Sequence, residues 1–265
     1  MTETAMRDTV THRPGPAVVA LEGVSKIYGD TVKVKAVNRL SLRIDAGELV
    51  AIMGPSGSGK STVLNVVAGI LPATSGTVRV GGQDLAGMSD EEAATFRREQ
   101  LGFVFQDFNL VDTLTIQENI MLPLMLAAHE SPREMRRHSR ELAGLLGIGD
   151  VLEHRVHEVS GGQAQRAAIG RAIIHGPQLL LADEPTGNLD SAAAQDVMRI
   201  FSDLNEQRGV STIVVTHDAR TASWCKRVVF IKDGTVHSEL YREDDRQAFY
   251  DEILNVLKLI GGETR

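Results

Sequence analysis

The chain has 265 residues, 42% of them hydrophobic, and a formal net charge of −7 from 28 basic and 35 acidic side chains. This content is ample for a core and fits one large or two small domains. The acidic balance argues against general nucleic-acid binding, because such binding depends on neutralising phosphates. We therefore expect no nucleic-acid partner.

Three further features of the sequence indicate the expected cellular location of the protein. The single cysteine, Cys225, cannot form an internal disulfide, which suits a reducing cytoplasm. The sequence has no apolar run near the ~20 residues that span a bilayer. Residues 1–17 lack the apolar region of a secretory signal and predict a disordered tail. If the chain works at a membrane, a partner must hold it there.

The N-terminal third mixes antiparallel strands with a βα unit. In 36–44, apolar residues alternate with Ser41 and Arg43, which is the period of a half-buried strand. Residues 48–53 form a short apolar run typical of a buried strand, and Val78 and Val80 mark another. A helix is expected over 61–70.

Residues 54–61 read GPSGSGKS and fit the phosphate-binding pattern G-x-x-x-x-G-K-[ST] at every fixed position. The glycines allow a tight turn that points backbone N–H groups inward, at the start of a helix where the dipole favours anions. The lysine would reach the β- and γ-phosphates, and the serine would place its hydroxyl on Mg²⁺. The alternative is a chance match by a Gly/Ser-rich loop. The predicted phosphate-binding residues are Gly54, Pro55, Ser56, Gly57, Ser58, Gly59, Lys60, Ser61 and Thr62.

The middle of the chain predicts a helix-rich insertion over about 88–158. Ser89 and Glu92 fit a capping box, and so do Ser131 and Glu134, with proline at the favoured first helical position. The second of these helices should run to about Gly147. A strand is expected between them at 101–105.

The final third returns to α/β alternation. Residues 178–182 and 211–215 are apolar runs typical of buried strands. A helix is expected over about 191–208, ending at Gly209. Asp233-Gly234 lies between apolar runs and predicts a hairpin.

Two acids end the first of these strands, in the sequence LLLADE at 179–184. Ligands bind at the carboxyl edge of open α/β sheets, so these acids are candidates for nucleotide chemistry. Asp183 would hold Mg²⁺ through a water, and Glu184 would polarise the attacking water as general base. The alternative is a strand that ends in two solvated carboxylates.

The segment SGGQ at 160–163 opens a predicted helix. A Ser-Gly-Gly turn at a helix start offers free N–H groups and the positive end of the dipole to an anion. The pattern is weak alone, because many helices begin with serine. Its position shortly before the LLLADE strand makes it more specific.

Together these motifs resemble the ATP-binding subunit of an ATP-binding-cassette (ABC) transporter, over about residues 18–236. Residues 54–61 match its Walker A loop, 179–184 its Walker B strand, and 188–190 its D-loop. SGGQ matches the signature motif, contributed by Ser160, Gly161, Gly162 and Gln163, although Val159 stands where the family usually has leucine.

Three single residues take roles only through this resemblance. Gln106 matches the Q-loop glutamine, which senses Mg²⁺ and contacts the transport subunit. His217 matches the switch histidine that contacts the γ-phosphate. Tyr28 lies where the family places an aromatic ring on adenine. Without the resemblance, each would more simply be a loop or packing residue.

The resemblance also implies a fold and a narrower group. The fold is α/β: a P-loop NTPase (RecA-like) core with an antiparallel β subdomain and an inserted α-helical subdomain. TGNLD at 186–190 and LTIQENIMLPL at 114–124 are similar to the branch for macrolide export, lipoprotein release and cell-division complexes. Residues 103–115 and the tail 237–262 are similar to the bacitracin-resistance (Bce-type) ATPases of peptide-detoxification modules.

The tail, 237–265, predicts an amphipathic helix with one apolar face. The face consists of Phe249, Ile253, Val256, Leu257 and Ile260. We expect it to pack on its own domain; a second copy or the permease are the alternatives.

The resemblance implies an ATP hydrolase that closes as a homodimer on two ATP, with Mg²⁺, and drives an integral membrane permease. It would lie peripherally on the cytoplasmic side of the membrane. Antimicrobial peptide export or detoxification is the expected role, and a mechanical or regulatory ATPase of a lipoprotein-release or cell-division type complex is the alternative. Ribosomal or DNA-repair ABC proteins are disfavoured, since they carry a second cassette or a coiled-coil insertion. A P-loop kinase would not need SGGQ.

Overall fold

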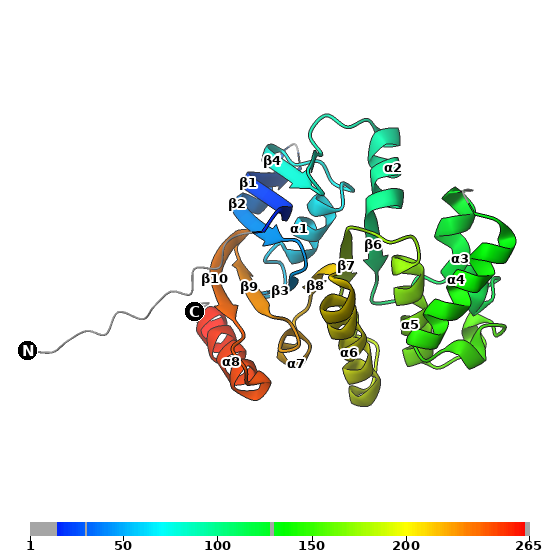
Figure 1. Cartoon of the computed structure of the whole chain (residues 1–265). Coiled ribbons are helices and arrows are strands. Elements are labelled where there is room, and N and C mark those ends of the chain that lie inside the picture. The colour runs from blue at the N-terminus through cyan, green and yellow to red at the C-terminus, as the bar shows by residue number, and fades with distance from the viewer. Residues whose placement is uncertain (1–14, 30, 128–129, 263–265) are drawn as a thin grey trace, which may run out of the picture.

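The computed structural model describes residues 15–29, 31–127 and 130–262. Two sheets organise these residues (Figure 1). The smaller sheet has the order β2-β1-β4-β5 and is antiparallel throughout. Its strands are β1 (Ala17–Tyr28), β2 (Val34–Asp45), β4 (Ser75–Val80) and β5 (Gln83–Asp84). This is the predicted antiparallel β subdomain. The predicted tail falls mainly on 1–14, outside the described residues.

The larger sheet has the order β10-β9-β3-β8-β7-β6. All of its neighbouring pairs are parallel except β10 with β9. Its strands are β3 (Leu49–Met53), β6 (Leu101–Val104), β7 (Leu179–Asp183), β8 (Ser211–Val215), β9 (Arg227–Lys232) and β10 (Thr235–Tyr241). Both faces of the parallel strands are covered, which is why β3, β7 and β8 are nearly continuous apolar runs.

Eight α-helices of the described chain surround the two sheets. They are α1 (Lys60–Val67), α2 (Asp90–Gln100), α3 (Ile116–Ala127), α4 (Pro132–Leu145), α5 (Gly161–Ile173), α6 (Ser191–Arg208), α7 (Ala219–Ala222) and α8 (Arg246–Gly262). Two 3₁₀ turns, η1 (Gly149–Val151) and η2 (Val156–Glu158), lie between α4 and α5. No helix in the described part of the chain combines the length and apolar character that crossing a bilayer requires.

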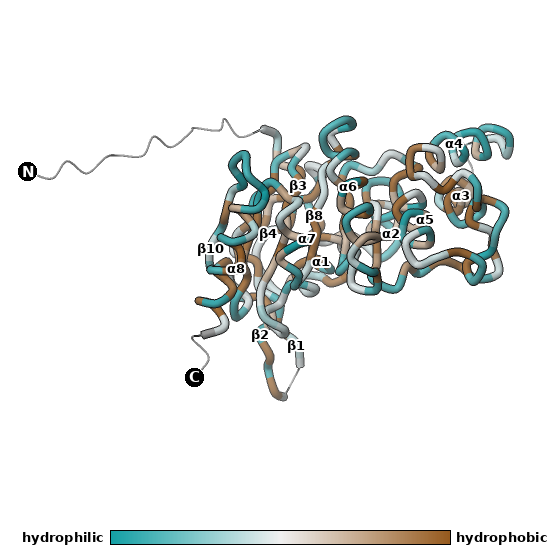
Figure 2. The backbone as a smooth tube through the Cα atoms, turned by 90° about the horizontal axis from the view of Figure 1, so that it is seen from below, coloured by the Kyte–Doolittle hydropathy of each residue, from teal (hydrophilic) through white to brown (hydrophobic). Residues whose placement is uncertain are grey.

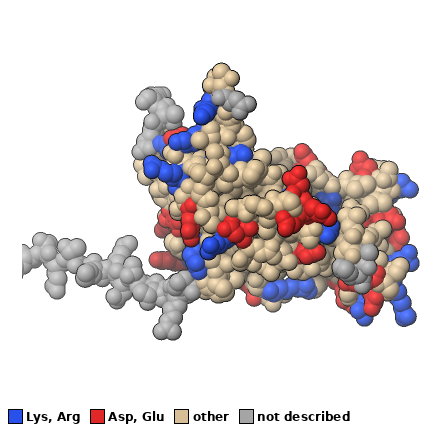
Figure 3. Space-filling view, turned by 90° about the horizontal axis from the view of Figure 1, so that it is seen from above, with Lys and Arg blue, Asp and Glu red and all other residues tan. Residues whose placement is uncertain are grey.

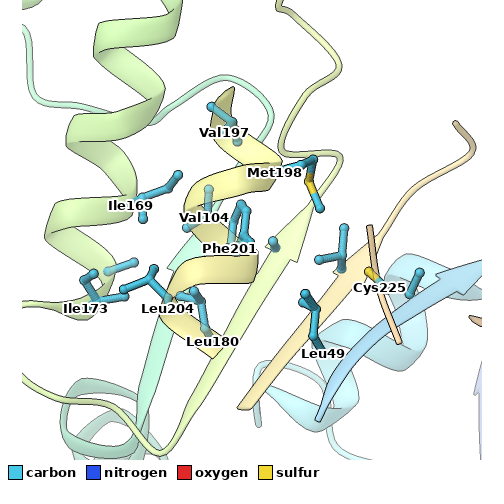
Figure 4. Close-up of a cluster of buried hydrophobic side chains, with 14 of the residues drawn as sticks. Leu49, Val104, Ile169, Ile173, Leu180, Val197, Met198, Phe201, Leu204 and Cys225 are labelled. Carbon is cyan, nitrogen blue, oxygen red and sulfur yellow. The ribbon is translucent and has the colours of Figure 1, made fainter. Parts of the chain in front are cut away.

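Strand β3 separates two hydrophobic clusters, because successive side chains of a strand point to opposite faces. Val50 and Ile52 join the cluster shared with α1 and the antiparallel sheet. Leu49 joins the other cluster, which includes Phe201 from α6 and Ile169 from α5 (Figure 4). Apolar segments run through the middle of the molecule while α4 is hydrophilic along much of its length (Figure 2).

The helix starts follow the predicted caps. The Ser89 and Ser131 side chains each accept from the backbone N–H three residues later, and the glutamate there returns the bond. Helix α6 ends where Gly209 takes a left-handed conformation, with φ 64°. The Asp233-Gly234 hairpin joins β9 to β10, with φ of 50° and 74°.

The segment 88–158 is not uniformly helical. Its strand β6 pairs with β7 and forms the edge of the main sheet. Helices α3 and α4 pack against each other and against α5, and they lie together at one end of the molecule (Figure 1). The inserted helical layer therefore starts after β6, and α2 lies before it. The division into domains stays a prediction.

Helix α8 packs on its own domain, as expected from its apolar face. Phe249, Ile253 and Ile260 are buried in the core cluster, and Val256 and Leu257 pack beside it. Two cation–π contacts add to this packing: Arg220 over Tyr250 and Arg246 over Trp224, the latter with 4.1 Å from the guanidinium carbon to the ring centre.

This packing gives the first prediction. Ile253 is fully buried, so Ile253→Ala should lower the free energy of unfolding by ~2–5 kcal/mol, through lost burial and the cavity left behind. Leu259, on the same helix, is 68% exposed, so Leu259→Ala should change it by less than ~0.5 kcal/mol. Urea denaturation of both variants measures the difference. Equal effects would mean that α8 is not docked in solution.

Candidate active site

The candidate residues converge because neighbouring parallel strands end at one edge of the sheet. The phosphate loop follows β3, His217 follows β8, and Glu184 follows β7. These three strands are consecutive neighbours in the sheet, and β6, which precedes Gln106, comes next. Residues up to 163 positions apart in the chain, Gly54 and His217, are thus brought to one edge by backbone pairing.

The phosphate loop needs its glycines for space as well as for conformation. Gly54 and Gly59 have φ of 151° and 102°. A Cβ at Gly54 would lie 2.0 Å from the Ile231 carbonyl oxygen, and one at Gly59 would lie 2.3 Å from that of Ala36. Because Gly59 is also the N-cap of α1, it offers no side-chain oxygen to the first N–H groups of the helix. These groups and the helix dipole are available to an anion.

Lys60 lies where a phosphate would be recognised. Its Nζ donates to the carbonyl oxygens of Gly54 and Pro55, both at 2.9 Å. Partial burial lowers the pKa of this ammonium group, and the nearby charges of Glu184 and Asp183 oppose the shift. A phosphate would replace the carbonyl contacts with a charge-assisted interaction.

Three donors hold the Glu184 carboxylate in place. The backbone N–H and the ring Nδ1 of His217 lie 3.0 and 2.7 Å from Oε1, and the Thr216 hydroxyl donates to Oε2 at 3.0 Å. Glu184 itself has φ 47°, a left-handed conformation that is strained for a residue with a side chain. The His217 side chain is 76% exposed, so its other ring nitrogen can reach a ligand.

Asp183 supplies a second carboxylate at the end of β7. Burial raises the pKa of this group, the Glu184 charge raises it further, and the Lys60 charge lowers it. The described residues contain no group of three or more His, Cys, Asp and Glu that could hold a metal ion. A carboxylate, the Ser61 hydroxyl and substrate phosphates are the oxygen donors that Mg²⁺ uses in such sites. The residues therefore fit Mg²⁺ only together with a nucleotide.

Gln106 points to the D-loop. Its Nε2 donates to Asn188 Oδ1 at 3.2 Å, and Asn188 Nδ2 donates to the Gln106 carbonyl at 3.2 Å and to Asp107 Oδ1 at 2.7 Å. The structure thus places Gln106 against Asn188, while its role toward Mg²⁺ stays a prediction.

The SGGQ segment begins α5 as predicted. Ser160 is the N-cap: its hydroxyl accepts from the Gln163 N–H, and Gln163 Oε1 accepts from the Ser160 N–H. A separate hollow there is lined by Ser160, Gly161, Gly162 and D-loop residues, with none from the phosphate loop. The hollow is thus separate from the phosphate loop of the same chain, and that the two are halves of a nucleotide site stays a prediction.

Tyr28 ends β1 opposite Val34, and the residue is 38% exposed. The Lys26 ammonium lies 5.4 Å from the ring centre. The exposed ring is accessible for stacking, and adenine binding there stays a prediction.

Sequence reasoning missed Thr216 and Gln165. Thr216 directly precedes His217 and holds the other oxygen of Glu184. Gln165 is fully buried and contacts the loops on either side of α5. A polar residue in the helix after SGGQ was the available signal for Gln165, while Thr216 gave none.

Comparisons with known proteins agree with this geometry. Residues 37–187 match the model of the ABC transporter family. The ABC transporter ATP-binding protein YxdL of Bacillus subtilis is 50% identical over 92% of this chain and 95% of its own. The bacitracin export ATP-binding protein BceA of Halalkalibacterium halodurans is 40% identical over 93% and 98%. A macrolide export ATP-binding/permease protein, of which this chain covers 31%, and a lipoprotein-releasing system ATP-binding protein match as well.

A solved structure shows the same fold. It is the dimeric, post-hydrolysis state of the ATP-binding cassette MJ0796 bound to ADP and phosphate, with a TM-score of 0.78 and 38% identity. The matched region covers 86% of this chain and all of the MJ0796 chain. The predicted family and α/β fold are confirmed. This chain belongs to the ABC transporter ATP-binding family and is an ATP hydrolase.

Proposed function

We propose that this protein is the ATPase subunit of a transporter that exports or detoxifies antimicrobial peptides. It closes as a homodimer on two ATP and drives an integral membrane permease from the cytoplasmic face. Similarity to BceA over nearly the whole of both chains carries the peptide assignment. A lipoprotein-releasing ATP-binding protein also matches, at 42% identity, and supports the alternative of a lipoprotein-release type complex.

The dimer part of the proposal rests on the two half-sites. The phosphate loop of one chain would bind the triphosphate, and Ser160 with its helix start would face the same nucleotide from the second chain. The ADP- and phosphate-bound relative is a dimer, which supports this arrangement. ATP would then join two surfaces that are each incomplete.

The proposed chemistry uses groups already in position. Lys60 and the N–H groups of α1 bind the β- and γ-phosphates. Mg²⁺, held through Ser61 and Asp183, would supply charge neutralisation on the phosphates. Glu184 orients the attacking water and takes its proton as the bond from the γ-phosphorus to the ADP oxygen breaks. His217 fixes Glu184 through its backbone and ring and can contact the γ-phosphate.

Surface charge is consistent with a protein partner. Lys and Arg are interspersed with Asp and Glu on the face seen in Figure 3, without the broad basic surface that phosphate neutralisation would use. The peripheral position at the membrane follows from the permease partner.

A permease gene next to this one, encoding a large extracellular domain inserted among about ten membrane spans, would support the Bce-type assignment. A four-span partner would favour the alternative.

Glu184→Gln tests the general base. The amide keeps the shape but cannot accept the proton of water, so turnover should fall by ~10²–10⁴-fold while ATP still binds. Glu206→Gln, at an exposed position of α6, should leave turnover unchanged. Phosphate release under saturating Mg-ATP measures both. Near-normal turnover of Glu184→Gln would remove this residue from the proposed role.

Mixed dimers test the shared site. Lys60→Ala removes the charge that faces the phosphates, and Ser160→Arg blocks the helix start, so each homodimer has two damaged sites. In a mixture, both lesions fall on one composite site and the other site keeps an intact loop and an intact SGGQ turn. ATP should therefore dimerise the mixture better than either variant alone, as measured by light scattering. Normal closure of Ser160→Arg by itself would show that SGGQ has only a structural role.

A further inference from the structure

Helix α5 carries a buried glutamine two residues after the SGGQ segment. Gln165 is fully buried, and its Nε2 donates to the carbonyl oxygen of Pro185 at 2.6 Å and to that of Phe105 at 3.4 Å. Pro185 follows the proposed base, Glu184, and Phe105 precedes Gln106 in the chain. One side chain therefore ties the helix that begins at SGGQ to both catalytic loops.

Only the donating half of the Gln165 side-chain amide is satisfied. Its Oε1 is buried and finds no hydrogen-bond partner among the described residues. Burying an amide oxygen without a partner costs free energy, which an apolar side chain of similar size avoids. The two hydrogen bonds that Nε2 donates to the Pro185 and Phe105 carbonyl oxygens explain why position 165 is a glutamine.

A second side chain of α5 holds the next part of the Gln106 loop. The Arg171 guanidinium donates to the carbonyl oxygen of Phe108 at 2.9 Å and also to that of Asn109. This guanidinium is partly withdrawn from water, and this burial lowers its pKa. Phe108 and Asn109 have φ of 60° and 50°, two successive residues in the strained left-handed region. A guanidinium binding both carbonyls stabilises this conformation.

We propose that Gln165 and Arg171 are positioning residues that make the Gln106 loop and the Glu184 loop follow the position of α5. The N-terminus of α5 would meet the partner's nucleotide, so closure would displace α5 and these bonds would carry the displacement to both loops of the same chain. Coupling of this kind requires contiguous contacts, which the two side chains supply. The inference rests on the proposed function, since it assumes that SGGQ binds the partner's ATP.

The test uses hydrogen–deuterium exchange of the full chain in the Glu184→Gln background, with and without ATP. In this reference protein, ATP should protect both residues 160–163 and residues 105–111. Adding Gln165→Met should leave the protection at 160–163 and abolish, or at least halve, the protection at 105–111. Arg171→Met should leave the protection at 160–163 and abolish, or at least halve, the ATP-dependent protection at 108–111 alone.

Matched controls separate this effect from a loss of stability. Gln117 is also a buried helical glutamine, and its Nε2 donates to Ser139 Oγ at 3.0 Å; among the described residues its side chain makes no hydrogen bond to either loop. Gln117→Met should therefore keep both responses, as should Arg199→Met on the exposed side of α6. With Glu184 intact, Gln165→Met should lower kcat and leave the KM for ATP nearly unchanged.

Two different results would overturn the inference: one concerns the positioning role of α5 alone, and the other concerns the proposed dimer site. Full ATP protection of 105–111 in both Gln165→Met and Arg171→Met, with normal kcat, would show that α5 does not position these loops. Absence of any ATP response at 160–163 in the reference protein would overturn the proposed dimer site, and this inference with it.

Discussion

The parallel pairing of β9, β3, β8, β7 and β6 is the constraint on which the site depends. It fixes which loops are neighbours: the phosphate loop lies between the ends of β9 and β8, and Glu184 lies between His217 and Gln106. These strands are buried on both faces, so a one-residue shift of register would move each side chain into the opposite hydrophobic cluster and disturb the packing of both. The edge that carries the chemistry is therefore held by the core of the protein.

Within this frame, hydrogen bonds set the positions of the reactive groups. Glu184 accepts three of them in a backbone conformation that is strained for glutamate, which is a frequent property of functional positions. Gln106 is bound to Asn188. Closure around a nucleotide would have to exchange some of these contacts for contacts to phosphate, and Gln165 and Arg171 connect that exchange to α5.

Much of the fold could be predicted from local signals. Capping boxes at Ser89 and Ser131, the glycine stop at Gly209 and the apolar face of α8 are short-range patterns, and the structure shows each of them. Helix α3 has no such signal: it contains Pro123, which normally ends a helix, yet Ile116 and Ile120 are fully buried and hold it in the core. The place of β6 at the sheet edge depends on pairing with β7, 78 residues later, which local periodicity cannot reveal.

Only part of the site could likewise be predicted from local sequence. The phosphate loop and the two acids at the end of β7 could be identified because their residue types have fixed mechanical roles. Gln106, His217 and Tyr28 required the family resemblance, since none has a local pattern. The bonds of Thr216 to Glu184 and of Gln165 to two loop carbonyls depend on side-chain directions that only the folded chain defines.

We propose that one chain holds two half-sites and that ATP joins them in a dimer. Sedimentation of Glu184→Gln with and without Mg-ATP, combined with a count of bound nucleotide, tests it most directly. We expect a monomer without nucleotide and a dimer containing two ATP with it. A monomer that binds ATP tightly and stays monomeric at every protein concentration would contradict it.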